Sequence, residues 1–202
     1  MRRSFAILTC ILLSSVVFSQ KQVSYVSEQT TEYIDTYFKI AIREMYEFGI
    51  PASITLAQGI LESGSGKSDL AQQANNHFGI KCTSDYQGER FLKDDDKKDD
   101  CFRVYEHAEA SYRDHSLFLS GRSRYFFLFN FSTTDYRSWA IGLKQAGYAT
   151  NPEYPQLLID VIQQNKLYEF DRHPERYVMR GENQTAGTDK EAFSKYRGRF
   201  FK

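Results

Sequence analysis

One carboxylate at the end of an uncharged segment is the side chain of this sequence best placed for acid catalysis. Residues 51–61 carry no charge, Glu62 follows them, and the chain then breaks at residues 63–66, Ser-Gly-Ser-Gly. If the segment is a helix, the partial negative charge at its end and its burial both raise the pKa of Glu62. A carboxyl group that stays protonated near neutral pH can protonate the leaving oxygen of a glycosidic bond.

Helical spacing determines where this carboxyl group points. On a helix, Ile54, Gln58 and Glu62 are four residues apart and share one face. Glu62 is therefore expected where the helix meets the core, or where a cleft is cut into that core. Gly64 and Gly66 have no side chains, so a bulky polymer could approach the carboxyl group. The alternative interpretation is that Glu62 is partly exposed and only caps a turn.

The rest of the chain predicts a mainly α-helical domain of the α+β class with one small β element. Apolar residues at helical spacing predict helices over residues 34–45, 51–62, 108–119, 136–143 and 158–162. The aromatic stretch 125–131 predicts a buried connector or a short helix. Residues 80–104 differ, because a polar, acidic middle separates two apolar flanks, and this pattern predicts a β-hairpin lobe.

Two cysteines, Cys82 and Cys101, lie within this hairpin segment. In an oxidising compartment an isolated pair of cysteines most simply forms a disulfide, which we expect to close the base of the hairpin. A metal site is disfavoured, because the two thiols lack further ligands at CxxC or HxxxH spacing. We expect neither a metal nor a cofactor.

The first residues indicate the compartment. Residues 1–19 open with two arginines and continue with a mostly apolar run of 14 residues, which is too short to span a bilayer comfortably. This pattern predicts a secretory signal peptide. Cys10 lies in the middle of the apolar run, which is the wrong place for a lipoprotein cysteine. We expect export to the periplasm, the cell wall or the extracellular space. The expected divisions are a signal peptide 1–19, a linker 20–29, a catalytic domain 30–172 and a polar C-terminal tail 173–202.

Charge and composition narrow the class of partner. The chain has 26 basic and 26 acidic residues, and loss of the two signal-peptide arginines leaves 24 basic residues and a net charge of about −2. This balance gives no basic excess for nucleic acid. No later segment is long and apolar enough to cross a membrane, and we expect a monomer. The 14 Tyr and 16 Phe residues fit a sugar-binding cleft or an ordinary core equally well.

Four motifs, in order along residues 30–171, carry a family resemblance. They are LAQGILESGSGKSDLA around Glu62, then NNHFGIKC, then FRVY, then GYATNPEY. The ordered set resembles glycoside hydrolase family 73, which comprises bacterial peptidoglycan N-acetylglucosaminidases with a lysozyme-like fold. The short hairpin with a cysteine near each end is similar to the form found in secreted members from Bacteroidetes-type bacteria.

The resemblance implies a helical domain and a β-hairpin lobe with a glycan groove between them. It implies that Glu62 is the general acid and that Tyr148 of the GYAT motif lines the groove nearby. By the same resemblance Asn76 and Phe78 shape the groove, although turn capping for Asn76 and core packing for Phe78 are equally good interpretations. Tyr86 is a further candidate for contact with a sugar face.

A second carboxylate is expected in the hairpin, where family members often carry a glutamate after a Thr-rich strand. This sequence has LKDDDKKDD there instead. Asp95 is our candidate, with Asp94, Asp96 or Glu89 as alternatives, because alternation along a strand does not fix the register. These acids also fit a solvated hairpin tip. The substrate's own N-acetyl group could replace a second carboxylate, as in substrate-assisted glycosidases.

The function that the resemblance implies is hydrolysis of β-1,4 bonds after N-acetylglucosamine in peptidoglycan glycan strands. A muramidase or lytic transglycosylase acting on the same polymer is the nearest alternative in chemistry. An inactive cell-wall-binding module is the alternative of another class, and the missing Thr-rich strand favours it.

Overall fold

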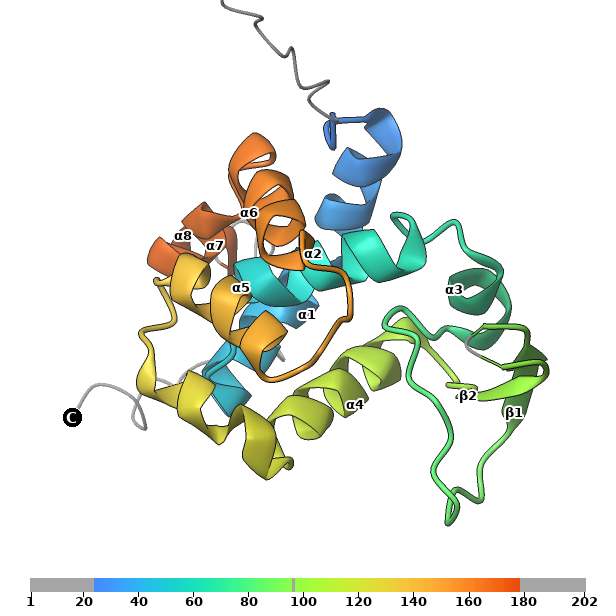
Figure 1. Ribbon diagram of the computed structural model, residues 1–202. Helices are drawn as coiled ribbons and strands as arrows, with labels where there is room; N and C mark the ends of the chain where they lie inside the picture. Colours follow the sequence, from blue (N-terminus) through green and yellow to red (C-terminus); the bar gives the residue numbers. More distant parts are fainter. Residues whose placement is uncertain (1–23, 96, 179–202) are drawn as a thin grey trace, which may run out of the picture.

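The computed structural model of the protein describes residues 24–95 and 97–178. The expected signal peptide 1–19, Cys10, Asp96 and the tail beyond residue 178 lie outside the described residues. Within the described ranges the chain is mainly helical with one small antiparallel sheet, so the expected fold class is confirmed (Figure 1).

The elements follow one another in the order α1 to α3, the hairpin β1–β2, and then α4 to α8. Their bounds are α1 Glu28–Phe48, α2 Ala52–Ser63, α3 Asp69–Ala74, β1 Arg90–Lys93, β2 Asp100–Arg103, α4 Ala108–Ser120, the 3-10 helix η1 Ser123–Asn130, α5 Tyr136–Gln145, α6 Tyr154–Gln164, α7 Tyr168–Arg172 and α8 Pro174–Val178. Helix α1 includes the last two residues of the expected linker. Helix α8 lies inside the segment expected to be a tail.

Helix α2 lies at the centre of the helical part and packs against α1, α5, α6 and α7. Ten of its twelve residues are buried, which is possible because the segment has no charged side chain before Glu62. Gly59 is required for this packing, since a Cβ atom at this position would lie 2.5 Å from the hydroxyl oxygen of Tyr33. The helix is therefore enclosed on all sides, and only its last turn reaches a surface.

Both ends of α2 are fixed by local hydrogen bonds. At its N-terminus, the carboxylate of Asp171 on α7 accepts hydrogen bonds from the backbone N–H of Ser53, at 2.9 Å, and from the Ser53 hydroxyl. At its C-terminus, Gly64 adopts the left-handed conformation with φ of 57° and donates its N–H to the carbonyl of Ile60. The predicted break after Glu62 is thus confirmed as a glycine-capped helix end.

The hairpin lobe, residues 80–104, contains the predicted disulfide, but the bond holds a different part of the lobe than expected. Strand β1 pairs with β2 in a register that sets Leu92 opposite Cys101. Cys82 lies on the other edge of β2, where its N–H donates to the carbonyl of Cys101 at 2.8 Å. The disulfide therefore ties the segment leading into the lobe to β2, and does not close the base of the β1–β2 hairpin.

The aromatic stretch 125–131 is only partly buried. It lies mostly in η1, where Tyr125 and Leu128 face the core three residues apart while Phe126 and Phe127 are exposed. The expected short helix is confirmed, but its burial is limited to one face.

Two further properties hold for the described part of the chain. No helix in it combines the length and the apolar character needed to cross a bilayer. No group of three or more potential metal ligands gathers within these residues.

Burial of Asp171 predicts a pH-dependent stability. Its carboxyl group is 6% exposed, and burial raises its pKa to about 7. At Asp171 the folded state therefore binds a proton that the unfolded state has released, so this one group lowers the free energy of unfolding between about pH 4 and pH 7, by at most about 1.4 kcal/mol per pH unit. The buried rings of His77 and His115, whose pKa values are lowered, contribute in the opposite direction, so the effect of Asp171 is seen as a difference between variants. Denaturant titrations from pH 4 to pH 8 should show the stability of the wild type falling relative to that of Asp171→Asn as the pH rises from 4 to 7.

Asp35→Asn is the matched control, because Asp35 is exposed on α1. Its stability should follow the wild-type pH profile. Parallel profiles for wild type and Asp171→Asn would contradict the assignment.

Candidate active site

A groove of about 870 Å³ runs between the helical part and the hairpin lobe, which lies to the right of the helices in Figure 1. Its lining comes from the last turn of α2, from residues 78–83, from residues 93–95 at the end of β1, from α4 and the start of η1, and from the α5–α6 connection. The groove therefore borders the one end of α2 that reaches a surface.

Glu62 lines this groove from the last turn of α2 and is half-buried. The hydroxyl of Tyr154, the first residue of α6, donates a hydrogen bond to its Oε1 atom at 3.1 Å. Burial raises the pKa of Glu62, and the hydrogen bond from Tyr154 offsets part of that rise. The result is a carboxyl group biased toward its protonated form, with a donor ready to stabilise the carboxylate once the proton has left.

A buried chain of hydrogen bonds orients Tyr154. The amide nitrogen of Gln58, one turn before Glu62 on α2, donates to the Tyr154 hydroxyl at 3.1 Å. The amide oxygen of Gln58 lies 3.1 Å from Nε2 of His115 on α4. Because that oxygen can only accept, Nε2 of His115 must carry the proton.

The protonation state of His115 is fixed by its surroundings. The ring is fully enclosed, and burial lowers its pKa to about 3, so it is neutral. A neutral ring with its proton on Nε2 leaves Nδ1 bare, and Nδ1 is buried without a hydrogen-bond partner among the described residues. In this arrangement the Gln58 amide nitrogen donates to the Tyr154 hydroxyl, and the hydroxyl proton points to Glu62.

Aromatic rings form the side of the groove next to this carboxyl group. Tyr148 stacks on Tyr154 with ring centroids 5.7 Å apart. Phe78 stacks on His115 at 4.2 Å, and both rings line the groove. Tyr148 and Phe78 both line the groove, and Phe78 is at the same time part of the core; contact of either ring with a sugar stays a prediction.

Asn76 and Tyr86 do not lie where the resemblance suggested. The Asn76 side chain is 1% exposed and bonds the backbone of Ile80 and the carbonyl of Arg103, so it holds the entry to the hairpin lobe and does not face the groove. Tyr86 donates to the carbonyl of Val104 and stacks on the Arg103 guanidinium, outside the groove. The turn-capping interpretation of Asn76 was the better one.

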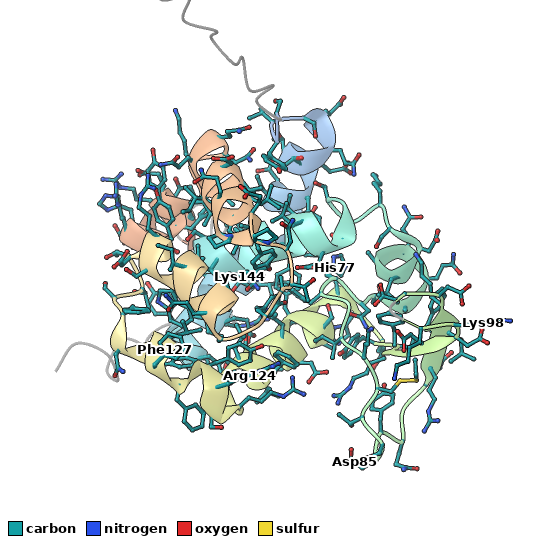
Figure 2. All side chains as sticks on the ribbon, in the orientation of Figure 1. His77, Asp85, Lys98, Arg124, Phe127 and Lys144 are labelled. Atoms are coloured by element: carbon teal, nitrogen blue, oxygen red, sulfur yellow. A yellow bond between two sulfur atoms is a disulfide. The ribbon has the colours of Figure 1, made fainter. Side chains whose placement is uncertain are left out.

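Of the candidate second carboxylates, Asp94 and Asp95 line the groove and Glu89 does not. Asp95 forms an ion pair with Nζ of Lys81 at 2.8 Å, while Asp94 accepts a hydrogen bond from the backbone N–H of Asp99 at 2.9 Å. Figure 2 shows Lys98 at the turn of this hairpin and Asp85 at the outer end of the loop before β1. Asp95 thus combines groove exposure with a cationic partner, and its role stays a prediction.

The sequence analysis missed the residues that bond Glu62 or orient its hydrogen-bond partner. Tyr154 is the last residue of the quoted motif GYATNPEY, and Gln58 was placed on the face of Glu62, so both had a local signal. His115 had none, because only the folded chain brings α4 against α2. Lys81 was likewise not foreseen as the partner of Asp95.

Comparison with known proteins identifies the family of this chain. The family model described as mannosyl-glycoprotein endo-beta-N-acetylglucosaminidase matches residues 38–167. The peptidoglycan hydrolase FlgJ of Pseudomonas aeruginosa is 30% identical over 154 residues, covering 68% of this chain and 37% of FlgJ. The exo-glucosaminidase LytG of Bacillus subtilis is 29% identical over 172 residues, covering 79% of this chain and 59% of LytG. The chain thus spans well under two thirds of the length of either relative.

Solved structures give the same assignment. A peptidoglycan hydrolase from Sphingomonas sp. A1 superimposes with a TM-score of 0.60 and 26% identity, covering 77% of this chain and 97% of that one. The glycoside hydrolase domain of FlgJ from Salmonella typhimurium gives a TM-score of 0.59 and 27% identity, covering 76% and 98%. The matched residues contain Glu62, Tyr148, Tyr154 and most of the groove. The protein therefore belongs to the glucosaminidase family of glycoside hydrolases.

Proposed function

We propose that this protein hydrolyses the β-1,4 bond after N-acetylglucosamine in peptidoglycan glycan strands, with Glu62 as the proton donor. The observation that carries the proposal is the half-buried Glu62 carboxyl group, with a raised pKa and a hydrogen bond from Tyr154, on a groove between two lobes. Relatives named peptidoglycan hydrolase and exo-glucosaminidase support the substrate class. Since this polymer lies outside the cytoplasmic membrane, the proposal includes action in the periplasm or the cell wall.

In the proposed reaction, Glu62 passes its proton to the glycosidic oxygen as the bond to the anomeric carbon breaks. The carboxylate that results is stabilised by the Tyr154 hydroxyl, which remains a donor because burial and the nearby Glu62 raise its own pKa far above the usual value. Tyr148, stacked on Tyr154, supplies an apolar face against which a sugar ring can pack.

The anomeric carbon then requires an oxygen atom from water. Asp95 is the candidate base, because it lines the groove and forms an ion pair with Lys81 there. An aspartate is one methylene shorter than the glutamate usual in the family, which suits activation of a water molecule better than direct attack. Participation of the substrate's N-acetyl group is the alternative, and it would make Asp95 dispensable.

Replacement of Glu62 by glutamine should abolish glycan cleavage while the protein stays folded. Loss of a general acid costs about 10²- to 10⁴-fold in rate. The measurement is digestion of purified peptidoglycan by residues 20–202, followed by mass spectrometry of borohydride-reduced fragments. Products ending in reduced N-acetylglucosamine, absent with Glu62→Gln, would support the proposal.

Other products would point to other functions. Fragments ending in reduced or anhydro muramic acid would indicate a muramidase or a lytic transglycosylase. A wild-type protein that binds the polymer and releases nothing would indicate a wall-binding module.

Removal of the Tyr154 hydroxyl should slow the reaction and change its pH profile. A hydrogen bond to a charged group contributes about 1.5–3 kcal/mol, so Tyr154→Phe should lose roughly 10- to 150-fold in kcat/KM. Without this bond the pKa of Glu62 rises, so the acid stays protonated to higher pH, and the alkaline limb of the kcat/KM profile should move upward. Tyr136→Phe is the control, because the hydroxyl of Tyr136 bonds Gln163 outside the groove. An unmoved alkaline limb would speak against Glu62 as the acid.

Asp95→Asn distinguishes a protein base from substrate assistance. If Asp95 activates water, its substitution should lower kcat by at least about 100-fold. Asp94→Asn is the matched control, because Asp94 also lines the groove but bonds only the backbone of the hairpin turn among the described contacts. Equal, small effects of both substitutions would assign the second role to the N-acetyl group.

A further inference from the structure

Two arginines line the groove on the side of η1, and their charges are not matched by nearby acids. Arg122 precedes η1 and is half-buried, while Arg124 lies in its first turn and is exposed. Figure 2 shows Arg124 between Phe127 and the hairpin lobe in this view. Among residues 24–95 and 97–178, no ion pair joins either guanidinium group to a carboxylate.

Aromatic rings hold both guanidinium groups in place. The Arg122 guanidinium carbon lies 3.5 Å from the centre of the Phe118 ring, and that of Arg124 lies 4.8 Å from the centre of the Tyr125 ring. These two rings are 5.8 Å apart, and Tyr148 lies 6.3 Å from one and 6.4 Å from the other. The two guanidinium groups are thus held beside Tyr148, which stacks on Tyr154, the hydrogen-bond donor to Glu62.

The acids around them already have other partners. Asp114 accepts hydrogen bonds from Nη1 of Arg103 at 2.9 Å and from the hydroxyl of Tyr105. Asp95 pairs with Lys81 within the hairpin lobe. Burial, and after it the positive charge of the neighbouring Arg124, lower the pKa of Arg122. An anion in the groove would relieve this repulsion.

We propose that Arg122 and Arg124 bind a carboxylate carried by the substrate strand, and this proposal rests on the proposed function. N-acetylglucosamine has only neutral groups, so it gives a guanidinium pair nothing to neutralise. Muramic acid carries a lactyl carboxyl group, which is either free or extended by a stem peptide that ends in carboxylates. A guanidinium group matches a carboxylate with two parallel hydrogen bonds.

A second, smaller cavity favours a branch of the substrate at this place. It measures about 240 Å³, and Arg122, Phe118 and Lys81 line both it and the main groove. A glycan strand lying along the groove could therefore extend a side group past Arg122 into this space. The arginines would then select strands with a substituted muramic acid and set their register relative to Glu62.

The test compares three ligands that carry different carboxylates or none. They are glycan strands with stem peptides, strands freed of stems by an amidase, which expose the lactyl carboxylate, and uncharged oligomers of N-acetylglucosamine. Dissociation constants are measured with Glu62→Gln protein, with and without Arg122→Gln and Arg124→Gln, and KM is measured in the active background. We expect the double substitution to weaken binding of carboxylate-bearing strands by roughly tenfold or more and to leave the neutral oligomers unaffected.

Two further variants sharpen the comparison. Arg137→Gln is the matched control, because Arg137 is also an exposed arginine over a tyrosine ring, on α5 and outside the groove. It should bind all three ligands like its parent. Lysine at positions 122 and 124 keeps the charge but not the paired donors, so it should restore only part of the affinity. Thermal unfolding of each variant verifies that it is folded.

Each outcome decides the proposal. An arginine effect on the stem-free strands alone identifies the lactyl carboxylate, and an effect on the stem-bearing strands alone identifies the stem. An effect on both identifies a position that accepts either carboxylate. Equal effects on neutral and charged ligands, or no binding of charged strands, would overturn it. If the wild type cleaves normally while the arginines make no difference, only this proposal fails. If binding depends on the arginines but the wild type cleaves nothing, the proposed function fails and the carboxylate site stands.

Discussion

The enclosure of α2 is the constraint on which the rest of this structure depends. A helix with no charge before its last turn can be surrounded by α1, α5, α6 and α7, and only its C-terminal end then reaches the surface. Glu62 lies at that end of the helix. Its burial, its hydrogen bond from Tyr154 and its place on the groove all follow from the position of one helix in the core.

The same enclosure sets the orientation of the polar groups behind Glu62. Gln58 is fully buried, so its amide must find partners inside the protein, and it finds them on α6 and α4. These two contacts leave no freedom in which way the amide points. The helical part thus holds the Tyr154 hydroxyl and the Glu62 carboxyl group in fixed positions at the groove. Arg122 and Arg124 are held in a comparable way, because each stacks on an aromatic ring.

Local sequence was a reliable guide where the physical cause is local. The uncharged run before Glu62 and the glycines after it act within one helix, and they predicted both the helix and its end. Pairings across the chain were harder to foresee. Tyr154 meets Glu62 across 92 positions of sequence, and His115 meets Gln58 across 57. We expected Asn76 at the groove because its motif adjoins the groove. In the structure its side chain is buried, because it forms hydrogen bonds with the backbone of Ile80.

The two sides of the groove also differ in what holds them together. The helical side has a large core, whereas the hairpin lobe has a small cluster formed by Leu70, Ala74 and Phe102, together with the short β1–β2 ladder. The bond between Cys82 and Cys101 adds the covalent tie that keeps the segment of Lys81 against β2. Such a bond forms in oxidising surroundings and is kept open by cytosolic reductants. For an exported chain, this bond would form only after translocation, so the groove would reach its full rigidity outside the cytoplasm.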